Sequence, residues 1–258
     1  MKTIMIILQF FVLCVFLPGC EEYEMIQYGE GGEINFMSDY YLGQRSKPSW
    51  QDNVEGLHYE VNFGLNPLGD SLLMDTVLIG VKISGIYTDY PRKVVFTTKV
   101  PEQNALEVIY PEEYYVPADT GRAEFRILLK RPETRNVEYS ADLTFDYEKS
   151  DFKAGTVERQ VFKLKVQNTV NMELWGTYKE EWDDYYSIFF GAYSETKARY
   201  LITKYGCTKL NEWVATSGFT TLWITNVFYK DFEAYKANPA NKPLIDENTG
   251  EWISIPKF

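Results

Sequence analysis

The sequence predicts a mainly β protein, in which an immunoglobulin-like antiparallel β-sandwich is followed by a small α+β domain. Three observations lead to this prediction. Between about residues 33 and 168, short segments of alternating apolar and polar residues are separated by turns that contain Pro and Gly, the pattern of an antiparallel sandwich. Residues 171–258 carry five of the six Trp and contain aromatic residues at helical spacing. An apolar leader of 19 residues precedes both parts.

The leader has the three parts of an export signal. Lys2 supplies positive charge, residues 4–17 are apolar apart from one Gln, and the small residue Gly19 precedes Cys20. This run of 14 residues is shorter than the roughly 20 residues that a membrane-spanning helix needs. The segment is similar to bacterial lipoprotein signals, which implies cleavage after residue 19 and lipidation of Cys20, including palmitate. Two or more acyl chains anchor a protein stably to a membrane.

Residues 20–32 form an acidic tether. Glu21, Glu22 and Glu24 follow the Cys directly and resemble the surface-export signal of Bacteroidetes lipoproteins. We therefore expect a lipid-anchored outer-membrane protein displayed on the cell surface; the alternative is an anchor that faces the periplasm. Glu-rich segments are also typical of solvated linkers, so the acidic residues have a second explanation.

Composition excludes some classes of function. Removal of residues 1–19 takes away Lys2 and leaves 25 basic and 37 acidic side chains, a net charge of −12. An acidic chain without a basic block makes nucleic acid an implausible partner. With Cys14 removed and Cys20 lipidated, Cys207 is the one remaining thiol, so no internal disulfide forms, and we expect it to have a packing role.

The sandwich domain is assigned to residues 33–169. Its turns include Asp89-Tyr90-Pro91 and the run 116–121, whose Pro, Asp and Gly suit tight backbone geometry. Residues 38–56 are expected to form a long loop. Strands are predicted over residues 34–37, 58–65, 75–84, 93–100, 108–115 (interrupted by Pro111), 123–129, 139–147 and 161–166.

The second domain is assigned to residues 170–258. Residues 183–190 are predicted as a strand. Ser194 is a suitable helix N-cap, and the helix after it carries Tyr200, Leu201 and Tyr205 at helical spacing. A second helix is predicted over residues 221–237, and residues 244–253 are predicted as a terminal hairpin with a Gly-containing turn.

The chemistry of an enzyme is hard to assemble from this sequence. His58 is the only histidine, which leaves no Ser-His-Asp set unless His58 is its base, and His58 with Cys207 cannot complete a zinc site. Two carboxylate clusters, at residues 112–113 and 180–184, leave a glycoside hydrolase as a remote alternative. We therefore expect a protein that is not an enzyme and needs no cofactor.

Aromatic residues of the second domain are the remaining candidates for ligand contact. Large rings serve as core in small domains, and exposed rings stack on sugars. We expect most of the group at residues 175–193 to be core. The candidates for ligand stacking are Trp175, Trp182, Tyr185 and Tyr186.

Several stretches in order along the mature chain resemble a family of Bacteroidetes lipoproteins, the domain of unknown function DUF4843. They lie at residues 75–85, at 115–118 followed by 125–131, at 175–176, at 190–197 and at 243–247. The family brings no established activity and no catalytic residue; its members look like surface proteins near polysaccharide-uptake systems. The expected function is a non-enzymatic binding or accessory module for polysaccharide uptake, with a membrane and outer-membrane uptake proteins as partners. The alternative is a structural or protein-interaction subunit of an outer-membrane complex.

Overall fold

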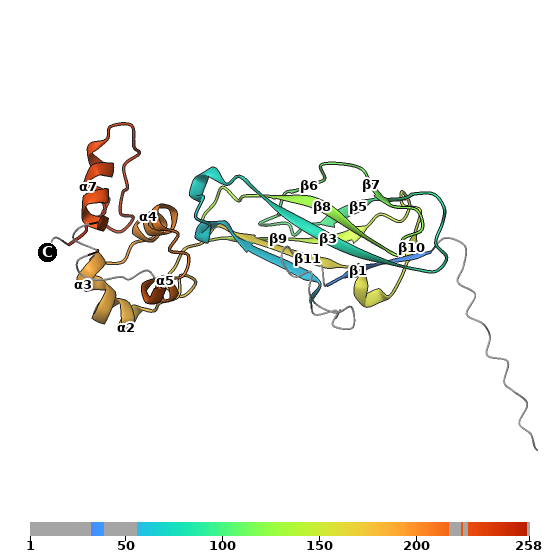
Figure 1. Cartoon of the computed structure of the whole chain (residues 1–258), viewed down its shortest axis with the longest axis horizontal. Helices are drawn as coiled ribbons and strands as arrows, with labels where there is room; N and C mark the ends of the chain where they lie inside the picture. Colours follow the sequence, from blue (N-terminus) through green and yellow to red (C-terminus); the bar gives the residue numbers. More distant parts are fainter. Residues whose placement is uncertain (1–31, 39–55, 217–222, 224–226, 257–258) are drawn as a thin grey trace, which may run out of the picture.

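The computed structural model of the chain describes residues 32–38, 56–216, 223 and 227–256. It is elongated, with the strands at one end and the helices at the other (Figure 1). Cys20 and nearly all of the predicted tether lie outside the described residues, and so do residues 39–55 of the predicted long loop. Within the described part of the chain, no helix is long and apolar enough to span a membrane.

The strands form two larger sheets and a two-stranded ribbon. The five-stranded sheet has the order β10 (Lys153–Ala154), β1 (Glu33–Met37), β3 (Met74–Ser84), β8 (Arg122–Lys130) and β6 (Val108–Ile109). The four-stranded sheet has the order β2 (His58–Asn62), β11 (Phe162–Gln167), β9 (Glu138–Phe145) and β5 (Phe96–Lys99), and the ribbon pairs β4 (Arg92–Val94) with β7 (Tyr114–Val116).

Alternation along the strands determines which side chains enter the core. In β3, Val77, Ile79, Val81 and Ile83 are all buried, as expected when every second residue points to one face. The inner face also carries stacked rings; the Phe36 and Phe145 centroids lie 4.2 Å apart. The predicted β-sandwich is thereby confirmed. Most strand pairs are antiparallel, but β1 pairs with β10 and β2 pairs with β11 in parallel.

The helical part contains α2 (Lys179–Glu181), a π-helical turn η6 (Trp182–Tyr186), α3 (Ser187–Phe190), α4 (Glu195–Tyr205), α5 (Leu210–Thr216) and α7 (Tyr229–Ala237). The predicted strand at 183–190 is wrong, because these residues are helical. Trp182, Tyr186 and Phe190 recur every fourth residue and are buried, whereas Tyr185 and Ile188 are exposed. Aromatic residues favour strands in general, but here burial of one helical face determines the structure.

Helix α4 begins and ends where the sequence predicts a helix. The Ser194 hydroxyl accepts the Lys197 N–H at 3.2 Å, and Gly206 ends the helix in the left-handed region at φ 69°. The second predicted helix is described as α7; residues 217–222 and 224–226 lie outside the described part. The predicted terminal hairpin is reduced to one bridge between Ile245 and Trp252, so the C-terminal part is helical rather than an even mixture of helix and strand.

Buried apolar residues form two separate clusters. One lies between the sheets and runs in sequence from Ile34 to Val166, and the other lies among the helices and runs from Val170 to Ile255. Two short 3-10 helices, η3 (Phe63–Leu65) and η4 (Gly69–Ser71), lie at the end of the sandwich that faces α4. The surface where the two parts meet is therefore built from loops and short helices.

Candidate functional site

Three of the four aromatic candidates lie in the helical core. Trp175, Trp182 and Tyr186 are at most 3% exposed. The Trp175 indole N–H donates to the Cys207 carbonyl at 2.6 Å, and the Trp182 indole N–H donates to the Gly191 carbonyl at 3.1 Å. A ring whose faces are covered by protein cannot stack on a sugar, so the prediction of ligand stacking is wrong for these three residues.

Tyr185 differs from the other three candidates because it is 47% exposed. Its ring contacts those of Tyr186 and Phe189 edge to face, with centroids 5.0 and 5.5 Å apart. The role of Tyr185 in ligand stacking stays a prediction, and it would act as the one exposed ring among the four candidates.

The carboxylates weighed for hydrolysis lie on exposed surfaces. Glu113 pairs with the Lys93 ammonium at 3.0 Å and accepts the Tyr115 hydroxyl at 2.8 Å. Those two groups lower the pKa of Glu113, first Tyr115 and then Lys93. A general acid of a glycosidase needs a raised pKa, so Glu113 is unsuited to that role. In the second cluster, Asp183 pairs with Lys179 on an exposed helical turn.

His58 and Cys207 lie in different surroundings. His58 begins β2 and is exposed. Cys207 is buried in the helical core, which confirms its packing role, and burial raises the pKa of its thiol. Among the described residues, no group of three His, Cys, Asp or Glu side chains could hold a metal ion.

A concave site is found where the sandwich meets the helices. This junction cleft has a volume of about 560 Å³, within the roughly 300–1,000 Å³ range that is usual for ligand pockets. It is lined by Gly64 of η3, Gly69 and Asp70 of η4, Arg135, Tyr235 of α7, the segment Lys242–Ile245, and Thr196, Arg199, Tyr200, Thr203 and Lys204 of α4.

Close packing of the backbone brings the two parts together beside the cleft. A Cβ on Gly64 would lie 2.5 Å from the Thr169 carbonyl oxygen, and a Cβ on Gly69 would lie 2.5 Å from the Thr203 Cγ2 atom. A larger residue at Gly69 would collide with α4, and one at Gly64 would collide with the segment that leaves β11 toward the helices. Gly69 therefore allows η4 of one part to approach a side chain of the other.

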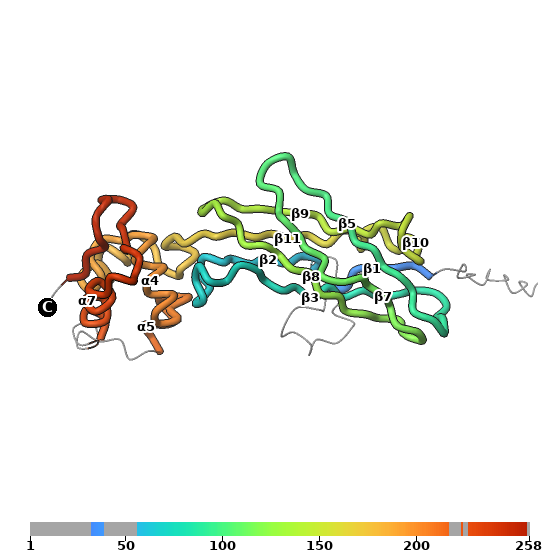
Figure 2. Tube along the Cα trace, turned by 90° about the horizontal axis from the view of Figure 1, so that it is seen from above, coloured from blue at the N-terminus to red at the C-terminus, as the bar shows by residue number. Residues whose placement is uncertain are grey.

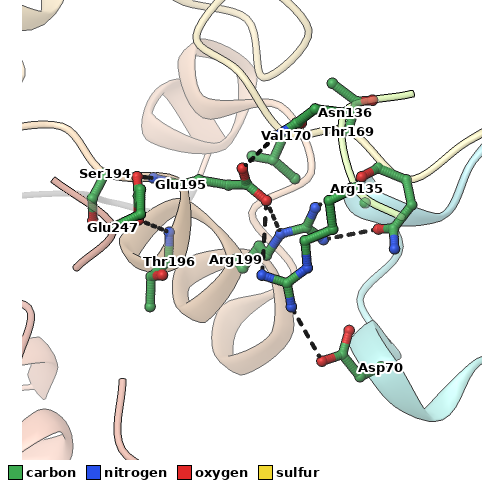
Figure 3. A network of polar contacts seen from close by, with 12 residues as sticks. Asp70, Arg135, Asn136, Thr169, Val170, Ser194, Glu195, Thr196, Arg199 and Glu247 are labelled. Atoms are coloured by element: carbon green, nitrogen blue, oxygen red, sulfur yellow. Dashed lines mark hydrogen bonds and ion pairs between the residues drawn. The ribbon is translucent and has the colours of Figure 1, made fainter. Parts of the chain in front are cut away.

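Glu195, the first residue of α4, is the centre of a polar network at the junction (Figure 3). Its carboxylate accepts the Arg199 Nε–H at 2.6 Å and the Asn136 amide at 2.9 Å, and Arg135 lies 3.9 Å away. Arg135 and Asn136 belong to the loop between β8 and β9, so the network joins the sandwich to α4. Glu195 has little solvent exposure, and such partly buried ion pairs are weakly screened by salt.

All three guanidinium nitrogens of Arg199 donate hydrogen bonds. In addition to Glu195, its two terminal nitrogens donate to the Asn168 side-chain and main-chain oxygens, each at 3.1 Å. Burial lowers the pKa of Arg199, and the Glu195 carboxylate opposes that shift. Arginine keeps its charge in proteins, so Arg199 is a fixed cation at the wall of the cleft.

Arg135 is bound much more loosely than Arg199. Its side chain is 46% exposed, and it lies 3.5 Å from Asp70 and 3.9 Å from Glu195. Figure 3 shows its guanidinium between these two carboxylates, which come from opposite parts of the molecule. An exposed cation held at such distances can turn toward a ligand at little cost.

The lining of the junction cleft is basic in an acidic protein. Four basic side chains line it (Arg135, Arg199, Lys204 and Lys242), and three carboxylates face them: Asp70 in the lining, Glu195, which pairs with Arg199, and Asp231, 3.9 Å from Lys204, so four minus three leaves an excess of one positive charge. The whole chain carries a net charge of −11. A local excess of positive charge in a concave site attracts anionic ligands.

These residues were missed by the sequence prediction, because charged residues at positions 70, 135, 199 and 242 are typical of solvated surfaces. The only local sign of the junction in the sequence was the pair Gly64 and Gly69, which lie close to Thr169 and Thr203 in the folded chain. Nothing in the spacing of the charges indicated that they meet.

The model of the family DUF4843, a domain of unknown function, matches residues 62–207 of the chain, which is more than half of its length. The chain belongs to this family. The matched range includes η3, η4, the β8–β9 loop and α4, and so covers most residues of the polar network. No curated protein matches the chain.

Several solved structures are similar to the chain at low sequence identity. The apo form of the Calx CBD1 domain is 10% identical, with a TM-score of 0.32, and the match covers 55% of this chain and all of that domain. A candidate carbohydrate-binding protein from Bacteroides ovatus is 7% identical (TM-score 0.33; 45% of this chain, 36% of that one). EndoBT-3987 from Bacteroides thetaiotaomicron is 11% identical (TM-score 0.32; 46% and 30%). The chain thus spans about a third of the two Bacteroides proteins.

Proposed function

We propose that this DUF4843 protein is a non-enzymatic lipoprotein of the bacterial outer membrane, displayed on the cell surface, and that it binds acidic saccharides in the junction cleft. The observation that carries the proposal is the basic, concave junction cleft in an otherwise acidic chain. Carboxylate or sulfate groups on a glycan are the ligand chemistry that arginine and lysine recognise, arginine in bidentate fashion.

The location rests on the leader sequence. The run that ends in Leu17-Pro18-Gly19-Cys20 is similar to lipoprotein signals, and the acidic residues after it are similar to a surface-export signal. Cys20→Ala removes the acceptor of the lipid, so we expect the variant to leave the membrane fraction while its far-UV circular dichroism is unchanged. Retention of Cys20→Ala through high-salt and carbonate washes would contradict the anchor.

Absence of catalysis is proposed because the cleft does not offer a suitable carboxylate pair. Glycosidases use two carboxyl groups on either side of the bond that is cleaved. Asp70 is the one carboxylate among the lining residues, and the Glu195 carboxylate at the same junction accepts hydrogen bonds from Arg199 and Asn136. We therefore expect bound oligosaccharides to be recovered intact, as judged by mass spectrometry after long incubation.

Ligand binding is tested with a change that removes one positive charge from the cleft and with a matched change elsewhere as the control. Arg135→Gln removes the loosely held cation, and Arg122→Gln removes an exposed cation of β8 at the opposite end of the sandwich. On an array of uronate-bearing, sulfated and neutral glycans, we expect the wild type and Arg122→Gln to retain acidic glycans. Arg135→Gln should bind them at least tenfold more weakly, since one charge-assisted contact contributes about 1.5–3 kcal/mol.

The result that would overturn the glycan proposal is equal binding by Arg135→Gln and the wild type, or retention of neutral glycans alone. No retained glycan across the whole panel would also exclude it. All three proteins are applied to the same array. The circular dichroism spectrum of each variant separates loss of folding from loss of binding.

A protein-interaction subunit is the second candidate function, and one surface favours it. Leu68, Leu73 and Met74, beside η4 and at the start of β3, are 62%, 63% and 46% exposed. Neighbouring exposed apolar residues mark protein interfaces. Leu73→Ser should then reduce recovery of an integral uptake protein in pull-downs from membranes, without a change in glycan binding. Recovery of the lipoprotein alone from the wild type would exclude this function.

A further inference from the structure

Two loops at the end of the sandwich remote from the helices expose apolar side chains. Residues 85–91 connect β3 to β4, and residues 117–121 connect β7 to β8; we call them the tip loops. Ile86, Tyr87 and Tyr90 are 65%, 55% and 58% exposed, although they are large and apolar or aromatic. Figure 2 shows this end of the sandwich at the opposite extreme of the molecule from α4, α5 and α7.

The tip loops are held in one arrangement by contacts between them. The Asp119 N–H donates to the Thr88 carbonyl at 2.8 Å, and the Thr88 hydroxyl donates to the Tyr90 carbonyl at 2.8 Å. Gly121 leaves room for the Tyr87 hydroxyl, since a Cβ there would lie 2.5 Å from it. The apolar side chains are therefore presented outward by a rigid support, which lowers the entropy cost of binding.

The chain enters the sandwich at the same end. Glu33 pairs with Ser84, the last residue of β3, and a Cβ on Gly32 would contact the Ile83 side chain at 3.4 Å. Gly32 lies twelve positions after Cys20. Twelve residues of chain reach roughly 40 Å at most. A lipid on Cys20 thus keeps the tip loops close to the bilayer, at a high effective concentration.

We infer that the tip loops rest on the lipid bilayer that holds Cys20, with Ile86, Tyr87 and Tyr90 in its interfacial region. Tyrosine, with an apolar ring and a polar hydroxyl, is favoured at the membrane–water interface. The exposed charges within the tip loops are the carboxylates of Asp89 and Asp119. These carboxylates are not attracted to a lipid surface, so the contact would depend on the three apolar or aromatic side chains and should be insensitive to salt. This orientation rests on the proposed lipid anchor, and it presents the junction cleft to the medium.

The test places a fluorophore at the tip loops and at a control position. Ile86→Cys, Tyr90→Cys and Tyr178→Cys are made in the full chain, purified with the native anchor, reconstituted into phosphatidylcholine vesicles and labelled with an NBD maleimide. Tyr178 is the matched control, because it is 61% exposed in the helical part. The wild type reports background labelling, which should be low because Cys207 is buried.

We expect a blue shift of the NBD emission and at least twofold quenching by doxyl-labelled lipids at positions 86 and 90, unchanged in 1 M salt, and neither effect at position 178. Vesicle flotation is measured on the same samples. Protein that floats without a blue shift at 86 or 90 overturns the bilayer contact and leaves the anchor intact. Equal shifts at all three positions overturn the stated orientation. Protein that does not float overturns the anchor and, with it, this inference.

Discussion

Lys197 is a buried cation in the helical core with an unusual set of partners. The side chain is 1% exposed, and its ammonium donates to the Phe190 and Ala192 carbonyls, each at 2.6 Å. Burial lowers the pKa of Lys197 from 10.5 to about 8, and the nearby carboxylates of Asp246 and Glu247 oppose the shift. Because the folded pKa is below the unfolded value, the unfolded chain binds more protons between those two pH values.

The free energy of unfolding should therefore rise with pH as Lys197 loses its proton in the folded state. The burial penalty is fully present below about pH 8 and is relieved as the pH rises toward 10.5. Relative to Lys197→Met, the wild type should gain about 2 kcal/mol between pH 7 and pH 9.5. Urea unfolding of both proteins at the two pH values measures this gain. Titration of the tyrosines contributes equally to both proteins, so it is absent from the difference between them. An identical pH dependence for both proteins would show that Lys197 keeps its ordinary pKa.

Helix α4 is the element that connects the junction to the C-terminal segment. Its first turn is capped twice: by the Ser194 hydroxyl, which accepts from Lys197, and by the Glu247 carboxylate, which accepts the N–H groups of Glu195 and Thr196, the latter at 3.2 Å. A carboxylate at this end also interacts favourably with the helix dipole. Figure 3 shows Glu247 next to the start of the helix, on a separate segment of the chain.

Removal of the second cap should destabilise the helical part. Glu247→Ala leaves two N–H groups at the start of α4 without their acceptor, and we expect a loss of about 1–2 kcal/mol. Glu251→Ala removes an exposed carboxylate of the same turn and should change stability by less than about 0.5 kcal/mol. Tryptophan fluorescence during urea unfolding measures both. Equal effects of the two changes would mean that Glu247 contributes as an ordinary surface residue.

At the scale of the whole molecule, the two apolar clusters are joined by polar contacts. The assignment of separate domains at residues 33–169 and 170–258 stays a prediction, and unfolding can test it. Five of the six Trp lie after residue 170, so tryptophan fluorescence follows the helical part, whereas far-UV circular dichroism follows helices and strands together, and its late phase reports the strands once the helical part has unfolded.

Arg199→Ala removes the cation that binds Glu195 and Asn168 across the junction, and should destabilise the helical part by about 2 kcal/mol or more. We expect the fluorescence transition to move to lower urea and to separate from the strand transition. Arg122→Ala, on the far end of the sandwich, should leave both transitions in place. If Arg199→Ala moved both transitions together, the molecule would be one cooperative unit and the domain assignment would be wrong.

The strands of the sandwich could be predicted because a half-buried strand leaves a local trace, as in the alternation of Val77, Ile79, Val81 and Ile83. The start of α4 was also predictable, since Ser194 caps the helix through the N–H of Lys197, only three residues further along the chain. Trp182, Tyr186 and Phe190 were mistaken for a strand, because aromatic residues suit both structures and only the helical core determines which face is buried. The alternative that Trp175 stacks on a ligand failed for the same reason: burial of a ring is decided by distant parts of the chain.

The sequence by itself determined the apolar run ahead of Cys20, the single histidine, the acidic charge and the order of most strands along the chain, since each can be read from the chain without its fold. Tertiary structure alone decided the strand order within the sheets, including the parallel pairing of β1 with β10, and the meeting of Asp70, Arg135 and Arg199 at the junction. Ion pairs between residues more than sixty positions apart leave no local periodicity. The basic cleft of an acidic protein could therefore be found only once the chain was folded.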